Sequence, residues 1–156
     1  MNKKYVKLII WITFLGSVSS ALGNLTKSGM GEWYQALNRS SLTPPSYVFG
    51  LVWSLLYVMI AISGWKIWES EHFAGLKSIK KLYVIQLILN WSWTPLFFGF
   101  HLTGYALACL PLIIICVTML ILKAYRNLSG VSLLLTPYLL WTVFASYLNF
   151  YIWQYN

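Results

Sequence analysis

Five long apolar runs divide this chain, and each is about as long as a membrane is thick. They cover approximately residues 5–26, 45–68, 79–99, 104–125 and 131–153. A helix of about 20 residues crosses a hydrocarbon core of about 30 Å. Backbone groups in lipid must be satisfied within the chain, and the alternating segments of about ten residues that mark a β-barrel are missing. The sequence therefore predicts an all-α membrane protein, a bundle of five transmembrane helices.

Little of the chain lies outside these runs. The sequence is 59% hydrophobic and 9% charged, whereas a soluble domain carries about 25% charged residues. The connections are short except at 27–44, where we expect Thr43 to cap the next helix, with Pro44 and Pro45 in its first turn. We therefore expect one five-helix transmembrane domain over residues 1–156, with a single long loop.

The basic residues indicate how the bundle is oriented in the membrane. The formal net charge is +8, but the charges lie in short gaps between apolar runs, so we expect no nucleic-acid partner. Lys27 and Arg39 fall on one side of the membrane. Nine basic residues fall on the other side, namely Lys3, Lys4, Lys7, Lys66, Lys77, Lys80, Lys81, Lys123 and Arg126. Because cytoplasmic loops are rich in Lys and Arg, the N-terminus is predicted in the cytoplasm and the C-terminus outside.

The N-terminus also has features of a signal peptide. Lysines precede the first apolar run, and Ser19–Ala21 offers a small-residue cleavage site. The apolar character continues past this point to Leu25, which makes the run long enough to span a bilayer. We therefore interpret it as the first transmembrane helix.

Ionisable side chains are confined to the connections. Glu32, Glu69 and Glu71 are the acidic residues of the chain, and His72 and His101 lie in or beside loops. Pumps driven by protons or ions place such groups within the membrane, so this distribution argues against a proton-coupled pump. No metal-ligand cluster, phosphate-binding glycine loop or nucleophile–base pair is visible. The histidines could ligate a haem iron, but solvated loop histidines are the simpler interpretation.

The two cysteines lie in one apolar run. Cys109 and Cys116 are seven positions apart, which corresponds to about 10 Å along a helix. That separation is beyond the reach of a disulfide. We interpret both as small apolar packing residues.

Aromatic and amide side chains share one helical face in three of the runs. These faces comprise Phe49, Trp53 and Tyr57; Gln86, Asn90, Trp93 and Phe97; and Tyr138, Trp141, Ala145 and Asn149. An amide that faces lipid is unsatisfied, so Asn90 and Asn149 should point inward, either toward a ligand or as hydrogen bonds between helices. Plain packing explains any single ring equally well. Together the faces predict an aromatic-lined pocket with few polar groups, suited to a flat, apolar, conjugated ligand.

Small residues at four-residue spacing indicate close contacts between helices. Gly16, Ser20 and Asn24 have this spacing, and so do Gly104 and Ala108. The spacing lets two helix backbones approach one another. The pattern leaves open whether the contact forms within one chain or between two.

Several stretches of the sequence carry a family resemblance. They are Trp33, Tyr34 and Leu37; Pro44, Pro45 and Val52–Tyr57; Gln86–Trp93 and Pro95–Gly99; and Pro137–Trp141, Phe144, Leu148, Asn149 and Trp153. In this order they resemble the first loop and the second, third and fifth helices of the translocator protein family, also called tryptophan-rich sensory protein or peripheral-type benzodiazepine receptor. The likeness extends over essentially the whole chain and favours a bacterial member in the cell membrane.

The resemblance implies a ligand and a site. Members of this family bind porphyrins, notably protoporphyrin IX, and synthetic isoquinoline and benzodiazepine ligands, in a pocket that the first loop, here 27–44, covers as a lid. Protoporphyrin IX or a haem-related tetrapyrrole is thus the expected ligand, and no cofactor is obligatory. Homodimers recur in the family. The ligand-binding residues implied by the resemblance are Tyr34, Pro44, Trp53, Asn90, Cys109, Trp141, Ala145 and Leu148.

The resemblance leaves several functions open. A sensor or regulator would hold the tetrapyrrole and change the state of the loop or of a partner. An enzyme-like protein would degrade protoporphyrin in light and oxygen, with Trp53 and Trp141 as the catalytic indoles. A passive transporter would carry porphyrins or other lipophilic molecules, and a structural scaffold would do none of these. The aromatic pocket without ionisable groups favours binding.

The chain departs from the family pattern at several positions. Ser40 stands where many members have proline, which predicts a more mobile loop. Tyr105 and Cys109 stand where animal members have Trp and Asp. Gln154 ends the stretch in which animal members carry the basic residue of a cholesterol motif, so no cholesterol role is expected.

Overall fold

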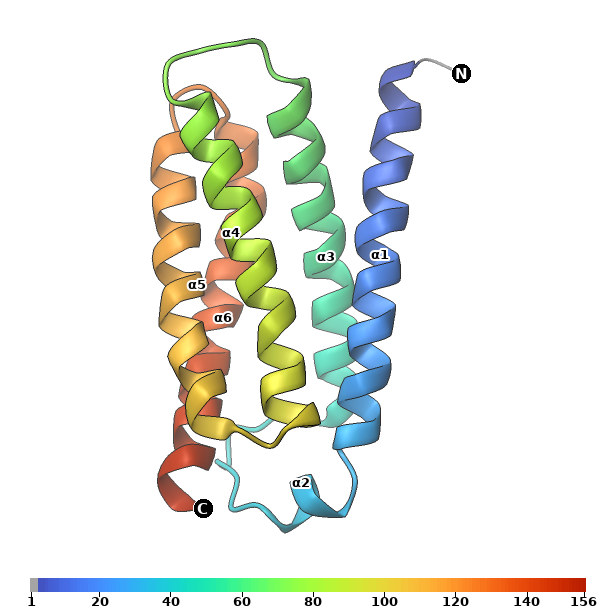
Figure 1. The fold of residues 1–156 in the computed structure, drawn as a ribbon, viewed down its shortest axis with the longest axis vertical. Helices are drawn as coiled ribbons and strands as arrows, with labels where there is room; N and C mark the ends of the chain where they lie inside the picture. Colours follow the sequence, from blue (N-terminus) through green and yellow to red (C-terminus); the bar gives the residue numbers. More distant parts are fainter. Residues whose placement is uncertain (1–2) are drawn as a thin grey trace.

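The computed structural model describes residues 3–156 and is built from helices. Five long helices lie side by side, and a short helix lies at the end of the bundle that also carries the C-terminus (Figure 1). In chain order the elements are α1 (Lys3–Gly29), α2 (Glu32–Ala36), α3 (Ser46–Glu69), α4 (Leu76–Thr94), the π-helical turn η1 (Pro95–Gly99), α5 (Thr103–Ala124) and α6 (Ser129–Tyr155). These described residues include no β-strand, so the predicted all-α class is confirmed.

The helix α1 is the least buried member of the bundle. α5 packs on both α4 and α6, α6 also packs on α3, and α1 packs chiefly on α3. The buried residue of α1 is Leu15, whereas α3, α4, α5 and α6 each bury at least seven residues. Four helices therefore share a common core, and α1 lies against the outside of that core.

The third predicted span, 79–99, consists of two elements rather than one. α4 ends at Thr94, and Pro95 begins the π-helical turn η1. Proline has no N–H, and its ring displaces the carbonyl of the preceding turn, so the ordinary helical bonding is interrupted here. A bond from the Phe100 N–H to the Pro95 carbonyl, 2.9 Å long, closes the wider turn.

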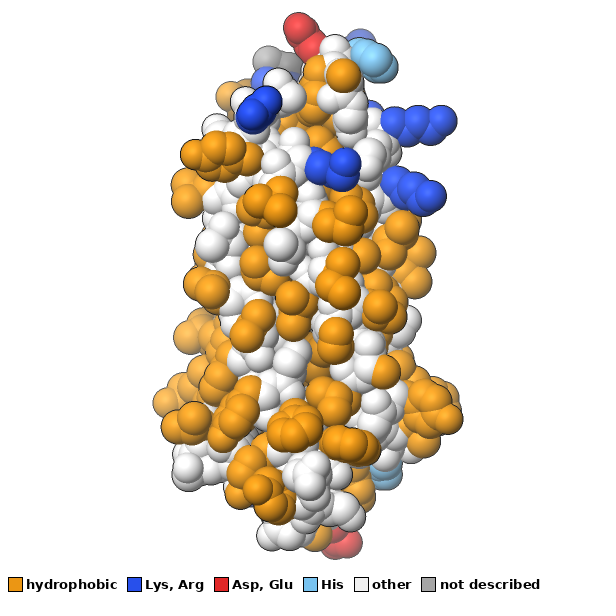
Figure 2. All heavy atoms as spheres, turned by 90° about the vertical axis from the view of Figure 1, so that its left-hand side faces the viewer, with side chains coloured by type: hydrophobic (Ala, Val, Ile, Leu, Met, Phe, Trp, Pro, Cys, Tyr) orange, Lys and Arg blue, Asp and Glu red, His pale blue; other side chains and the backbone are white. Residues whose placement is uncertain are grey.

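Within residues 3–156, four helices are long and apolar enough to cross a membrane, namely α1, α3, α5 and α6. α4 differs because its first turns carry Lys77, Lys80 and Lys81. Apolar side chains cover the flank of the bundle, and basic side chains gather at one end of it (Figure 2). The protein is therefore an integral membrane protein whose flank contacts the lipid bilayer.

The connection between α1 and α3 differs from the predicted loop 27–44 at both ends. α1 extends into it, and α3 begins only at Ser46. The predicted cap at Thr43, with both prolines in the first helical turn, is wrong. Pro45 occupies the N-cap position in an extended conformation, with φ −55° and ψ 149°. Thr43 and Pro44 each precede a proline, which disfavours the helical conformation and delays the start of α3.

Three aromatic rings fasten α1 to the bundle in the half that carries most of the lysines. Trp11, Trp68 and Tyr83 have ring centroids 5.3 to 5.9 Å apart, in edge-on or tilted contacts. The Tyr83 hydroxyl donates to the Ile60 carbonyl at 2.8 Å. Gly64 leaves room for this arrangement, because a Cβ at that position would overlap the Tyr83 hydroxyl and lie 2.7 Å from the Trp11 ring.

Gly64→Ala should destabilise the bundle. The added methyl displaces the Tyr83 hydroxyl and the Trp11 ring, and overpacking of this kind costs about 1–3 kcal/mol. Thermal unfolding in detergent should show the cost as a lower Tm. Gly50→Ala in the same helix is the matched control, because nothing lies within 4 Å of a Cβ at Gly50. Equal Tm values for the two variants would contradict the packing described.

Candidate ligand-binding site

A large cavity lies in the half of the bundle next to α2. Its volume is about 1090 Å³, and its walls come from α1, α3, α4, η1, α6 and the connection between α1 and α3. Ligand pockets typically measure about 300–1,000 Å³, so this cavity has room for a ligand of several fused rings. Its aromatic lining residues are Tyr34, Tyr47, Phe49, Trp53, Tyr57, Trp93, Phe97 and Phe98.

The amide of Asn90 joins three helices at the wall of this cavity. Tyr57 Oη donates to Asn90 Oδ1 at 2.6 Å, and Asn90 Nδ2 donates to Tyr138 Oη at 3.1 Å. Asn90 is 6% exposed, which confirms that it points inward. Its amide forms hydrogen bonds between helices, as one interpretation of the sequence holds, and the residue also lines the cavity.

Asn149 forms a second bridge of the same kind. Trp93 Nε1 donates to Asn149 Oδ1 at 3.1 Å, and Asn149 Nδ2 donates to the Thr103 carbonyl at 2.9 Å. These bonds connect α4, α5 and α6. Gln86, on the same face of α4 as Asn90, is fully buried, but neither of its amide atoms has a hydrogen-bond partner within residues 3–156.

Six of the eight residues implied by the resemblance line the cavity, namely Tyr34, Pro44, Trp53, Asn90, Ala145 and Leu148. Cys109 and Trp141 are not among the lining residues. The Cys109 thiol donates to the Leu89 carbonyl at 3.2 Å, between α5 and α4. The Trp141 ring lies 5.8 Å from Phe49, which does line the cavity. Trp53 is therefore part of the cavity wall, whereas Trp141 contacts a wall residue but does not line the cavity.

The segment 30–45, which includes α2, covers the cavity and is called the lid below. Trp33 of the lid stacks on the His101 imidazole, with ring centroids 3.9 Å apart and planes inclined by 13°. The centroid of the Tyr34 ring lies 6.4 Å from that of Phe97 and 5.6 Å from that of Phe98. The sequence predicts a solvated histidine at 101, and the residue is exposed. Its ring also packs on the lid through the stack with Trp33. His101 has φ 56°, in the left-handed region, where the chain turns from η1 into α5.

Hydrogen bonds tie the rest of the lid to α6 and the C-terminal end. Ser40 Oγ shares a hydrogen bond of 3.0 Å with Tyr147 Oη and accepts another, 3.2 Å long, from the Leu42 N–H. The Asn38 N–H donates to Asn156 Oδ1 at 2.8 Å. The sequence predicts a more mobile loop because Ser40 replaces a family proline. The structure places a buried hydroxyl with two partners at this position.

Small residues of α1 form part of the cavity wall. Gly16, Ser20 and Asn24, whose spacing predicts a close helix contact, line the cavity. Nothing lies within 4 Å of a Cβ at Gly16, so this residue makes no close contact within the chain, and a contact between two chains stays a prediction. Gly104 does permit a close approach within the chain, because a Cβ there would lie 3.1 Å from Trp153 Nε1.

Two basic residues, Lys27 and Arg39, also line the cavity. The sequence pattern pointed only to a topological role for them. The Arg39 guanidinium lies 5.0 Å from the centre of the Tyr34 ring. Burial raises the pKa of the Tyr34 phenol above its ordinary value, although Arg39 acts in the opposite direction. The phenol is therefore neutral at neutral pH and can donate a hydrogen bond.

The cysteines are unpaired. Cys109 and Cys116 are both free thiols, which confirms that their spacing does not form a disulfide. Across the described range 3–156, no three His, Cys, Asp or Glu side chains are placed to hold a metal ion.

These features define an integral membrane protein whose helices enclose an aromatic-lined cavity under a short helical lid. A sequence model of the TspO/MBR family matches residues 8–154. The chain is 35% identical to the tryptophan-rich protein TspO of Archaeoglobus fulgidus, over 97% of each chain. It is 32% identical to the translocator protein of Homo sapiens, over 94% of this chain and 91% of the relative. The chain belongs to the TspO/MBR family, which confirms the resemblance seen in the sequence.

His101→Asn should loosen the lid. Asparagine tolerates a left-handed backbone but has no ring to stack on Trp33, and an aromatic contact is worth about 0.5–1.5 kcal/mol. Hydrogen–deuterium exchange read by mass spectrometry should therefore be about two- to tenfold faster over residues 30–45. His72→Asn, at the other end of the bundle, is the control. Unchanged exchange of the lid in His101→Asn would show that the stack does not hold it.

Proposed function

We propose that this protein holds a flat, conjugated tetrapyrrole, such as protoporphyrin IX or a haem-related compound, and acts as a membrane sensor or regulator. The observation that carries the proposal is the cavity of about 1090 Å³ with aromatic residues in its walls. Flat conjugated rings stack on aromatic side chains or meet them edge to face. Isoquinoline and benzodiazepine-type ligands have the same character. In this proposal no cofactor is obligatory, because the ligand itself is the bound group.

The proposed membrane arrangement has five crossings within one domain, residues 1–156. α1, α3, α5 and α6 supply four crossings. α4 with η1 supplies the remaining one, because it runs alongside the other long helices over most of their length (Figure 1). Its lysines would lie at the cytoplasmic surface, with the N-terminus on the same side and the C-terminus outside. We further propose a homodimer in a bacterial cell membrane, as the family resemblance implies.

The character of the cavity favours holding a ligand over pumping one. Its described lining includes no carboxylate or imidazole, and such groups are the usual means of coupling transport to protons or ions. Passive transport of porphyrins or other lipophilic molecules is the alternative. The loosely packed α1 wall and the name of the human relative, translocator protein, favour that alternative.

Trp53→Phe should weaken the binding of protoporphyrin IX. The variant loses part of the aromatic surface in the cavity wall, and a loss of about 1.4 kcal/mol corresponds to a tenfold higher Kd. Titration in detergent, followed by quenching of tryptophan fluorescence, measures this change. Trp141→Phe should have a smaller effect, because Trp141 lies behind Phe49. Trp153→Phe, at an exposed position outside the cavity, is the control. Unchanged affinity in a Trp53 and Trp141 double variant would contradict the site.

Oxidative degradation of protoporphyrin IX is a second candidate function, favoured by the position of Trp53 in the cavity wall. The porphyrin would absorb the light, dioxygen would be the oxidant, and the protein would supply the geometry. Trp53 is the indole placed next to the ligand, and Trp141 lies farther away.

Under illumination in air, the bound porphyrin should lose its Soret absorbance faster than free porphyrin in the same detergent, and it should give a distinct product by mass spectrometry. Trp53→Phe at saturating porphyrin should slow this loss several-fold. The Trp153→Phe variant should behave like the wild type. Identical decay of bound and free porphyrin, with no distinct product, would exclude the degradation activity.

A further inference from the structure

Two basic residues, Lys27 and Arg39, lie at the end of the cavity next to the lid and are called its cationic end below. Lys27 lies in the last turn of α1, and Arg39 lies in the lid after α2. They are the two charged residues among the described residues that line the cavity. The other lining residues are aromatic, aliphatic or neutral polar, so the cavity combines a largely uncharged body with positive charge near the lid.

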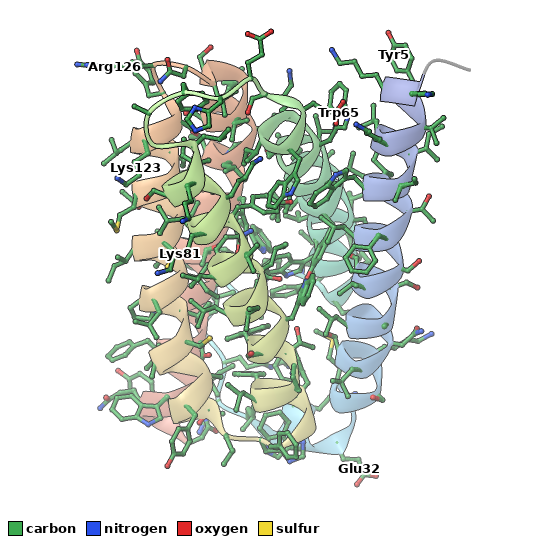
Figure 3. The ribbon with its side chains drawn as sticks, turned by 45° about the horizontal axis from the view of Figure 1, so that its top comes forward. Tyr5, Glu32, Trp65, Lys81, Lys123 and Arg126 are labelled. Atoms are coloured by element: carbon green, nitrogen blue, oxygen red, sulfur yellow. The ribbon has the colours of Figure 1, made fainter. Side chains whose placement is uncertain are left out.

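The acidic residues of the described chain do not offset this charge. The ion pair seen within residues 3–156 joins Lys7 Nζ to Glu69 Oε1 at 2.8 Å, at the end of the bundle opposite the lid. Glu71 follows α3 at that same far end. Glu32 lies at the lid end, but it points away from the bundle (Figure 3) and is not among the lining residues. The cationic end therefore faces the cavity without a carboxylate beside it in the wall.

Both residues are exposed, so water and salt screen their charge on the outer side. On the cavity side, walls of low dielectric constant focus the field of that charge. Arg39 is also held in place, since its guanidinium lies over the Tyr34 ring and Tyr34 is only 7% exposed. A guanidinium that contacts a ring keeps N–H donors at its edge, and these donors match the two oxygens of a carboxylate.

A simpler explanation is that both residues reach toward lipid headgroups, as interfacial Lys and Arg side chains commonly do. Cations of that kind would be indifferent to the charge of a ligand in the cavity. The dependence of affinity on ligand charge therefore distinguishes the two explanations.

We propose that Lys27 and Arg39 select ligands that carry a carboxylate at one edge of a flat apolar body. The rings of the ligand lie against the aromatic walls, and its carboxylate pairs with the cationic end beneath the lid. This inference rests on the proposed function and adds to it the charge and the orientation of the ligand.

The test compares protoporphyrin IX, a dicarboxylic acid, with its dimethyl ester, which has the same ring but no charge. Both are titrated by tryptophan quenching in one non-ionic detergent, which contains no anionic lipid. The wild type should bind the acid about tenfold more tightly than the ester, and added salt should reduce this preference. Lys27→Gln and Arg39→Gln should each weaken binding of the acid about three- to tenfold, and the double variant should lose the preference.

The ester serves as an internal control, because it reports any change that a substitution makes in the cavity apart from charge. The ratio of the acid and ester affinities is therefore the quantity compared. Lys123→Gln, at the opposite end of the bundle, should retain the full preference for the acid. Equal affinity of the wild type for acid and ester, or a preference that survives in the double variant, would overturn the inference while leaving the proposed function intact. Failure of both porphyrins to bind the wild type would overturn the proposed function and this inference with it.

Discussion

Hydrocarbon offers no hydrogen-bond partner to a polar group, and the structure of this protein follows from that constraint. The backbone meets it with long helices, and the buried amides of Asn90 and Asn149 meet it by bonding to side chains and carbonyls of other helices, whereas the buried Gln86 amide has no such partner within residues 3–156. Asn90 bonds Tyr57 and Tyr138, and Asn149 bonds Trp93 and the Thr103 carbonyl. These bonds hold α3, α4, α5 and α6 in register with one another. The wall that results is firm because opening it would leave amides unpaired in an apolar interior.

The opposite wall has a different physical basis. Hydrogen bonds of Asn38 and Ser40 hold one part of the lid. α1 and the α2 part of the lid are held by aromatic contacts, those of Trp11 with α3 and α4 and that of Trp33 with His101. Ring contacts of this kind can be broken without leaving a buried polar group unpaired, so they yield at a smaller cost than the amide bonds. Entry of a ligand into the cavity should therefore displace α1 or the α2 part of the lid more readily than the four-helix core.

Much of the site could be predicted from residue type and spacing. Spacings of four and three residues place Asn90 and Trp93 on the same helical face as Gln86, and lipid leaves an amide only the interior. Spacing alone did not show that Gly16 lines the cavity rather than a helix contact within the chain, because a small residue can mark a void as well as a contact. Spacing also could not separate Trp53, in the cavity wall, from Trp141, which lies behind Phe49. That difference depends on how the α3 and α6 faces meet.

The sequence by itself determined that the chain is a helical membrane protein, because the length and apolar character of its runs leave few alternatives in lipid. It also determined the family, through residues that the comparisons confirm. Only the tertiary structure showed that Lys27 and Arg39 line the cavity and that His101 stacks on the lid. Charge counts along a chain report the side of the membrane on which a residue lies. Whether that residue faces lipid, water or a ligand depends on the packing of helices far apart in the sequence.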